Sequence, residues 1–263
     1  MPADGQASSG YLVETDSARL LLDCGPGVAT ALSAVSDATD LDGVVISHLH
    51  ADHCYDLLPI GKSLLSATLE FPGGPAPLLR SLRRIPLFVP AGATEVFTRW
   101  AALFPVTTMP LLDKAFERAF DVREYQSGDR FDLGDATIDL HELRHVLPNC
   151  GIRIESGGAI LAYTGDTGMT DAAVKLAADA DLLLAEATLN APDVTGHGHL
   201  SALDAGTIAT RAGAHSLALT HFASGDGSWL ENLRATAASA FDGPIRLVRG
   251  GERVSVGGMR SGG

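Results

Sequence analysis

Hydrophobic and polar positions along the chain predict an N-terminal and a C-terminal half, each built from strands and helices. Short apolar runs bounded by polar turns have strand character; these runs are residues 10–15, 19–24, 41–48, 87–91, 121–126, 131–145, 151–156, 159–166, 181–188, 216–222 and 245–250. Runs with helical spacing of apolar residues are expected to form helices; these runs are residues 27–35, 56–70, 93–104, 111–120, 171–180, 200–213 and 229–241. The Pro- and Gly-rich stretch 71–86 is expected to be a surface loop running into the next strand.

This order of elements predicts an α/β fold with two sheets. Strands occur in both halves of the chain, and their side chains are apolar enough that the faces of the sheets must be buried. Two sheets, each covered on its outer face by helices, would bury them. Because 263 residues with 46% hydrophobic content are enough for one large core, we expect a single domain over residues 1–263.

Charge and cysteine content narrow the class of protein. The formal net charge of −13 disfavours non-specific binding to nucleic acid or to an anionic membrane, although it is compatible with a small anionic substrate. Cys24, Cys54 and Cys150 are odd in number and lack CxxC spacing, so no disulfide framework is expected. No apolar run reaches transmembrane length, and the N-terminus lacks the basic start and apolar stretch of a signal peptide. We therefore expect a soluble, cytoplasmic protein.

The segment ISHLHADH, residues 46–53, concentrates metal-binding side chains directly after an apolar strand. His48, His50, Asp52 and His53 fall within six positions. In a loop at the end of a strand these side chains can converge from several directions, which a metal ion requires. Imidazole and carboxylate ligands suit zinc, manganese or iron, and a set of this size can serve two ions. The sequence therefore predicts a two-metal centre.

Such a centre needs further ligands, and three more strand ends supply them. His145 lies in LRHVLPNCG, Asp166 in LAYTGDTG and His221 in LALTHF. Each of these residues stands where an apolar strand runs into a polar turn, which is also the context of residues 46–53. Any one of them alone would be as consistent with a structural role as with metal binding. Their shared context favours ligation.

Five motifs in order, SHLHADH, YTGDTG, AEAT, GHLS and LTHF, resemble the metallo-β-lactamase superfamily and, within it, the ribonuclease Z and phosphodiesterase branch. The resemblance covers about residues 10 to 250. It implies an αββα four-layer sandwich with the site at one edge of the two sheets. It also implies two divalent metal ions, for which we expect Zn²⁺, with Mn²⁺ or Fe²⁺ as alternatives. The implied ligands are His48, His50 and His145 for one ion, Asp52, His53 and His221 for the other, and Asp166 as the bridge.

The same resemblance implies three catalytic residues, Asp52, His199 and Glu186. His199 matches a non-ligand histidine that this branch places over the substrate phosphate, where an imidazolium could protonate the leaving oxygen. Glu186 is expected to hold the other ring nitrogen of His199. Three further histidines, His141, His197 and His215, receive no role.

Two departures from the family bear on structure and substrate. The family usually has a strand and a Gly-rich turn upstream of residues 10–15, so we expect the first sheet to lack its usual first strand. Bacterial ribonuclease Z enzymes carry a tRNA-gripping arm between the positions of His145 and Asp166, but only 20 residues separate these two here. Ala185 also stands where ribonuclease Z commonly has histidine.

The expected function is hydrolysis of a small phosphodiester by a hydroxide that bridges two metals, with a cyclic nucleotide such as cyclic AMP as the substrate. Two alternatives remain open: a tRNA 3′-end processing endoribonuclease of the ribonuclease Z type, and a hydrolase of the same fold acting on an ester or thioester. A third, from another class, is a silent binding protein that keeps the fold, but the chain retains every ligand. The expected partner is a small molecule rather than nucleic acid or a membrane, and a homodimer is compatible with the sequence.

Overall fold

Two β-sheets lie at the centre of the computed structural model, which describes residues 5–70, 74, 76–77 and 81–257. The first sheet has the order β1-β2-β3-β4-β5; its strands are Tyr11–Glu14, Arg19–Leu22, Gly43–Val45, Ile85–Pro90 and Phe120–Tyr125. The second has the order β12-β11-β10-β9-β8-β7-β6; from β6 to β12 its strands are Arg130–Leu133, Ala136–Leu143, Asn149–Ser156, Ala159–Tyr163, Leu182–Glu186, Leu217–Thr220 and Ile245–Leu247. Strands are therefore neighbours in space in the order in which they occur along the chain.

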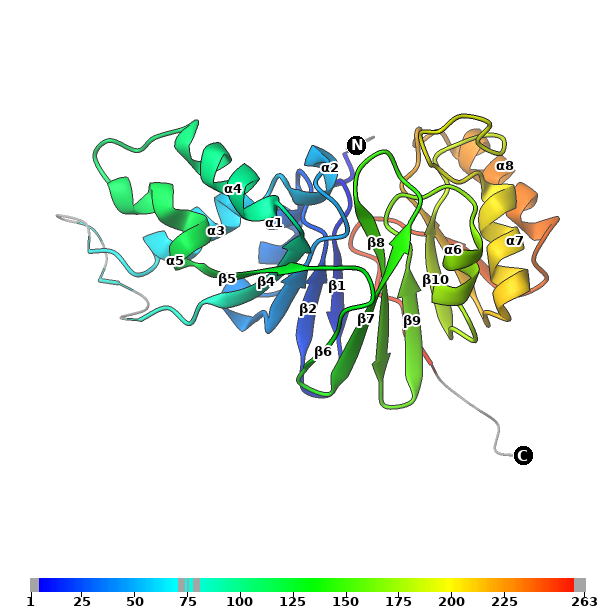
Figure 1. Ribbon diagram of the computed structural model, residues 1–263, viewed down its shortest axis with the longest axis horizontal. Helices are drawn as coiled ribbons and strands as arrows, with labels where there is room; N and C mark the ends of the chain where they lie inside the picture. The colour runs from blue at the N-terminus through cyan, green and yellow to red at the C-terminus, as the bar shows by residue number, and fades with distance from the viewer. Residues whose placement is uncertain (1–4, 71–73, 75, 78–80, 258–263) are drawn as a thin grey trace.

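Both sheets are mixed. In the first, β1 and β2 form an antiparallel hairpin and the remaining pairs are parallel. In the second, β6 to β9 form an antiparallel meander and β9 to β12 are parallel. Parallel neighbours need crossovers, and helices provide them. As a result the carboxyl ends of β3, β7, β9, β10 and β11 meet at one edge of the sandwich, the upper edge in Figure 1.

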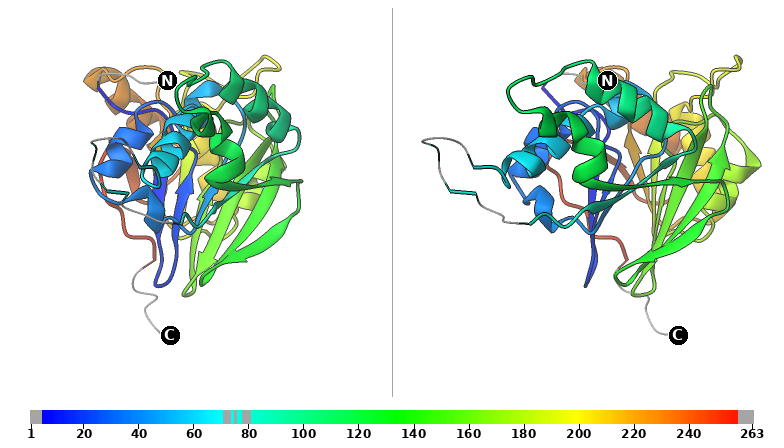
Figure 2. Two further views of the ribbon diagram at one scale, coloured as in Figure 1. Left: turned by 90° about the vertical axis from the view of Figure 1, so that its left-hand side faces the viewer. Right: turned by 60° about the vertical axis from the view of Figure 1, so that its left-hand side comes forward.

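Helices cover the outer face of each sheet, as Figures 1 and 2 show. Those of the N-terminal half are α1 (Val28–Ser33), α2 (Ala51–Cys54), α3 (Leu57–Ser66), α4 (Ala93–Ala102), α5 (Ala115–Arg118) and the 3₁₀ helices Ala38–Asp40 and Pro110–Lys114. Those of the C-terminal half are α6 (Asp171–Leu176), α7 (Ala202–Ala212) and α8 (Gly227–Ala238). None of the helices in the described part of the chain has the length and apolar character to span a membrane.

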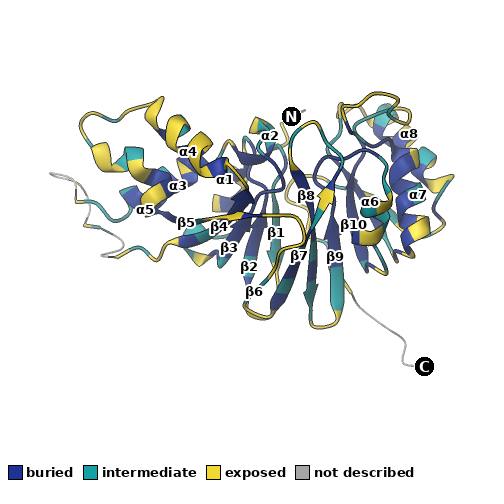
Figure 3. Ribbon diagram, in the orientation of Figure 1, coloured by how far each residue is buried: buried dark blue, intermediate teal, exposed yellow. Residues whose placement is uncertain are grey.

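Three apolar cores separate four layers. Successive side chains of a strand point to opposite faces, so β2 sends Leu21 into the core under α1, α3, α4 and α5 and sends Leu20 and Leu22 into the core between the sheets. The third core lies between the second sheet and helices α6 to α8, with Leu183 and Leu217 among its members. Buried positions accordingly fill the inner strands in Figure 3. The αββα sandwich expected from the sequence is confirmed.

The expected helix over residues 111–120 is confirmed only in part, because it is broken into two short helical pieces and ends before Phe120. A 3₁₀ turn, Pro110–Lys114, precedes the single α-helical turn α5, and Phe120 already opens strand β5. Phe120 is fully buried and pairs with Ile85 in the parallel β4–β5 ladder, so tertiary burial overrides the local helical pattern. Strand β4 also begins two residues earlier than expected, at Ile85.

Other expected elements occur with shifted ends. The expected strand 131–145 is the β6–β7 hairpin, turning at Gly134 with φ +59°. The expected surface loop 71–86 loses residues 85–86 to β4, and its residues 71–73, 75 and 78–80 lie outside the described part. Residues 5–10, which precede β1 in the described part of the chain, contain no strand.

Candidate metal centre

The segment 46–53 changes from loop to helix within the candidate site. His48 and His50 follow β3 outside regular secondary structure, with His50 in extended backbone, whereas helix α2 starts at Ala51. Asp52 and His53 therefore lie on the first turn of a helix and not in the loop that the sequence pattern predicted. This turn packs closely on Gly25: if residue 25 had a Cβ, that atom would lie 1.9 Å from the carbonyl oxygen of Asp52. Only glycine fits there.

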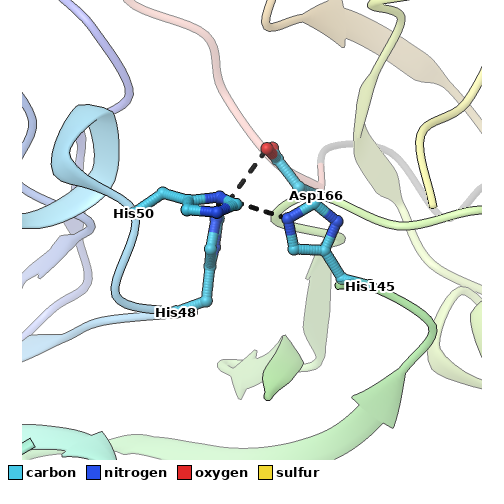
Figure 4. A group of neighbouring side chains, drawn as sticks. All are labelled: His48, His50, His145 and Asp166. Carbon is cyan, nitrogen blue, oxygen red and sulfur yellow. Dashed lines mark hydrogen bonds and ion pairs between the residues drawn. The ribbon is translucent and has the colours of Figure 1, made fainter. Parts of the chain in front are cut away.

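A first group of potential ligands gathers around His50. Its Nδ1 lies 2.9 Å from His48 Nε2 and 3.2 Å from His145 Nε2. Together with Asp166, these residues place one donor atom each within 4.8 Å of one another. Figure 4 shows the rings of His48 and His50, from one segment, converging with the ring of His145 and the carboxylate of Asp166 from others.

A second group lies on the other side of Asp166. Asp52, His53 and His221 also offer donor atoms within 4.8 Å of one another, and His221 Nε2 lies 3.3 Å from Asp52 Oδ2. The two oxygens of Asp166 face different groups: Oδ2 lies 3.8 Å from His48 Nε2, while Oδ1 lies 3.3 Å from His53 Nε2 and 3.6 Å from His221 Nε2. The structure thus brings all seven predicted ligands together, with Asp166 between the two groups.

Two buried atoms of this cluster fit a bound cation. His53 Nε2 and Asp166 Oδ1 are buried without a hydrogen-bond partner among the described residues, although they face each other at 3.3 Å. Buried polar atoms are nearly always satisfied, and leaving them unpaired is costly. A divalent ion between the converging imidazoles and carboxylates would satisfy both atoms, and the donor set suits such an ion.

The second ring nitrogen of four histidines is held by the protein. His53 Nδ1 lies 2.7 Å from Asp23 Oδ2, and His145 Nδ1 lies 2.9 Å from the carbonyl oxygen of Gly198. The remaining two contacts are His48 Nδ1 to Ser47 Oγ at 3.1 Å and His221 Nδ1 to Thr188 Oγ1 at 2.8 Å. Partners of this kind fix the tautomer and the ring orientation, which leaves each Nε2 facing the cluster.

Asp23 is the main site residue that the sequence interpretation missed. It is fully buried at the end of β2, and its carboxylate accepts hydrogen bonds from Ser47 N at 2.7 Å, Ser47 Oγ at 2.8 Å and Tyr163 Oη at 2.5 Å, besides holding His53. Asp23 ends an apolar run, as His145 and Asp166 do, so its sequence context was a usable signal.

Two residues of the site adopt left-handed backbone. Asp23 has φ +57° and His221 has φ +54°, values that cost side-chain-bearing residues about 1–3 kcal/mol. The hydroxyl of Thr188 donates to the carbonyl oxygen of His221 at 3.0 Å and helps to hold this conformation. Just before Asp166, Gly165 has φ +56°, and a Cβ there would lie 2.8 Å from Asn149 Oδ1.

Electrostatics differ between the two groups. Burial and the neighbouring His53 lower the pKa of His48 to about 2, and burial also lowers the pKa of His50 and His145. Burial acts in the same direction on His53, but the carboxylates of Asp23 and Asp166 outweigh it and raise the pKa of His53 to about 10. The three histidines of the first group are therefore neutral and ready for a cation, whereas a proton held on His53 would have to leave before that ring could become a ligand.

His199 and Glu186 form a pair beside the cluster. His199 Nδ1 lies 3.0 Å from both oxygens of Glu186, and 3.9 Å from Asp166 Oδ2. Burial alone would lower the pKa of His199, but the hydrogen bond to Glu186 and the nearby carboxylates raise it. Ser201 caps helix α7 through a capping box with Asp204, which fixes the chain two residues beyond His199.

Three histidines had no role in the sequence interpretation. His141 lies in β7, and His215 is exposed before β11. The ring of His197, in contrast, lies 5.0 Å from that of His199 and 5.7 Å from that of His145. The structure therefore adds His197 to the surroundings of the site.

Residues 18–222 match the family described as the beta-lactamase superfamily domain. The probable metallo-hydrolase YhfI of Bacillus subtilis is 31% identical to the chain, over 95% of this chain and 93% of that protein. A ribonuclease Z of Mycobacterium bovis is also 31% identical, over 97% and 94%.

Solved structures agree with these relatives. The crystal structure of the metallo-beta-lactamase fold protein YhfI from Bacillus subtilis has a TM-score of 0.80 and 28% identity, covering 95% of this chain and 93% of that one. Human tRNase Z, short form, has a TM-score of 0.69 at 23% identity, again over 95% and 93%, which is a likeness of fold.

Proposed function

The chain belongs to the beta-lactamase superfamily, as a metallo-hydrolase-like member with the metallo-β-lactamase fold, and we propose that it uses two divalent metal ions to hydrolyse a small phosphodiester. The observation that carries the two-metal part is the position of Asp166. Each of its oxygens faces a different group of histidines, which is what a bridging carboxylate requires. We assign the first ion to His48, His50 and His145 and the second to Asp52, His53 and His221, with zinc as the expected metal and manganese or iron as alternatives.

Asp52, His199 and Glu186 would position the attacking water and protonate the leaving group. When bound, a metal pair supplies a water of lowered pKa and a Lewis acid for the phosphoryl oxygens. Before a metal binds, the hydrogen bond to His221 lowers the pKa of the Asp52 carboxyl group, so Asp52 is ionised. With His221 Nε2 turned to a metal, Asp52 would accept a hydrogen bond from the attacking water instead. His199 would donate its proton from Nε2 to the leaving oxygen, because Glu186 holds Nδ1.

Asp166, Glu186, His199 and His221 also place donor atoms within 4.8 Å of one another, so this set offers an alternative arrangement of metal ligands. We assign proton transfer to His199 because both oxygens of Glu186 hold its Nδ1. This contact raises the pKa of His199 and keeps a proton available for the leaving group.

The short stretch of chain between His145 and Asp166 favours a small substrate. Strands β8 and β9 with their Gly157–Gly158 turn occupy almost the whole interval, so it holds no protruding arm. A net charge of −13 also gives no general attraction for a polyanion. We propose a cyclic nucleotide such as cyclic AMP as the substrate and a small molecule, not nucleic acid, as the partner.

A tRNA 3′-end endonuclease is the second candidate, and the 31% identity to a ribonuclease Z over nearly the whole chain favours it. A side-by-side assay of the metal-loaded protein on cyclic AMP, bis(p-nitrophenyl) phosphate and precursor tRNA separates the two. We expect turnover of the small diesters and little cleavage of the tRNA. If precursor tRNA is cut with kcat/KM of about 10⁴ M⁻¹s⁻¹ or more, the small-substrate proposal is wrong. An ester or thioester control tests the remaining hydrolase alternative.

A further inference from the structure

The loop Asp193–Gly198 stands beside the metal centre and is held in one shape by its own first residue. The Asp193 carboxylate accepts hydrogen bonds from Thr195 N at 2.7 Å, Thr195 Oγ1 at 2.6 Å and Gly198 N at 2.9 Å. Arg144 lies 3.7 Å from the same carboxylate, of which 5% is exposed. At the far end of the loop, the carbonyl oxygen of Gly198 contacts His145 Nδ1 at 2.9 Å. The loop is thus tied to a predicted metal ligand.

Gly198 is required for this approach. It has φ +89°, and a Cβ at this position would lie 2.5 Å from the carbonyl oxygen of Arg144 and 2.9 Å from His145 Cα. Only glycine tolerates both the backbone angle and the close contact. The backbone of Gly198 therefore packs directly against that of Arg144 and His145. This contact places the preceding residue, His197, next to the centre.

The ring of His197 packs against two histidines of the centre. The ring is stacked on that of His199, with centroids 5.0 Å apart and planes 27° apart, and meets the ring of His145 edge-on at 5.7 Å. The residue is exposed, whereas His145 and His199 are half-buried. Its backbone N–H donates to Thr195 Oγ1 at 3.1 Å, so the ring is presented by a fixed peptide.

The ring nitrogens of His197 also differ from those of its neighbours. His48, His53, His145, His199 and His221 each have a ring nitrogen within hydrogen-bond distance of a fixed protein atom. Among the described residues, no protein group hydrogen-bonds to the ring of His197. A donor on a rigid loop, adjacent to the proposed proton donor and without a protein partner, is suited to a ligand.

We propose that His197 is a substrate-binding residue that donates a ring N–H to a phosphate oxygen of the bound diester. This inference rests on the proposed phosphodiesterase function. An imidazole has an N–H in its neutral and in its charged form, so the contact does not depend on the titration of the ring. The nearby cation, Arg144, is already bound to the loop through Thr195 and Asp193. The protein as a whole is acidic, so an anionic substrate needs a hydrogen-bond donor at the site itself, which His197 would supply.

The test compares His197→Ala, His197→Gln and, as a matched control, His215→Ala, which removes an exposed histidine that precedes β11, at the opposite end of that strand from His221. The measurements are KM and kcat for bis(p-nitrophenyl) phosphate, bound metal, and the calorimetric affinity of the metal-loaded protein for inorganic phosphate. For His197→Ala we expect KM and the phosphate Kd to rise about tenfold or more, because a hydrogen bond to a charged group is lost. We expect kcat to change by less than about threefold and the metal content to stay at the wild-type value. His197→Gln should recover part of the affinity through its amide N–H, and His215→Ala should match the wild type.

Unchanged phosphate affinity in His197→Ala overturns the proposal. Loss of metal in that variant also overturns it, because the ring would then support the ligands rather than the substrate. A wild-type protein that turns over no phosphodiester refutes the proposed function instead, and phosphate calorimetry with the same variants still decides the role of His197.

Discussion

Replacing Asp23 by asparagine should disable the second metal site while keeping the shape of the side chain. The Asp23 carboxylate holds His53 through Nδ1 at 2.7 Å, which turns Nε2 toward the cluster. An asparagine amide placed there would donate to Nδ1, so the ring would carry its proton on Nε2, where the metal should bind. Changes in such supporting contacts typically lower metal affinity by about 10- to 100-fold.

The stability cost follows from the hydrogen bonds that Asp23 accepts. Asparagine can keep the bond from Ser47 N, whereas the hydroxyls of Ser47 and Tyr163 must reorient. A single unsatisfied buried group costs about 1–3 kcal/mol, so Asp23→Asn should fold with a loss in that range. Asp23→Ala would strand four donors and lose about 4–12 kcal/mol, which approaches the entire stability of a typical domain of about 5–15 kcal/mol.

Competition with a chelator measures the affinity of the weaker site, and ¹⁵N NMR of the histidine rings reports the tautomer of His53. Asp135→Asn is the matched control, because Asp135 accepts hydrogen bonds from Thr15, Ser17 and Ser156 on an exposed part of the surface. The control should bind metal like the wild type. Two metals bound to Asp23→Asn at wild-type affinity would refute the reasoning.

Two further predictions concern the centre itself. His199→Ala should keep both metals and lower kcat about 10²-fold for an alkoxide leaving group, but much less for p-nitrophenolate, which leaves without a proton; equal losses for the two leaving groups would exclude a general acid. Asp166→Ala should weaken both metal sites together, because its two oxygens face different groups, and metal analysis that shows loss of only one ion would contradict a bridging role.

The sequence predicted most of the candidate centre because its members stand at strand ends. Parallel strands bring their carboxyl ends to the same edge, so a polar residue after each apolar run is expected near the others. This reasoning located His145, Asp166 and His221, which the structure brings to the histidine-rich segment. It did not foresee the start of helix α2 at Ala51, because four residues are too few for a periodic signal.

The contacts that orient the ligands were harder to predict. Asp23 and Tyr163 are 140 residues apart, and nothing in either local pattern pairs them. The tether of His145 is a backbone carbonyl, at Gly198, which has no sequence signature at all. Likewise Phe120 left a helical pattern for strand β5 because of a ladder partner, Ile85, that lies 35 residues upstream. The local sequence pattern therefore indicates which side chains can bind a metal, whereas contacts between distant segments determine how those side chains are oriented.

The centre joins the two halves of the chain. Four of its candidate ligands, within residues 48–53, lie beside the first sheet. The other three follow β7, β9 and β11 of the second sheet. Asp23 spans the same boundary, since it follows β2 and contacts Tyr163 of β9, and Tyr11 of β1 contacts Thr220 of β11 at 2.6 Å. Donor atoms from both halves can converge only when the sheets are packed, so cations that bind this set would bind the folded sandwich and not the separate halves. By this reasoning, bound metals would stabilise the packing of the two sheets, and the apolar core between the sheets would in turn hold the candidate ligands together.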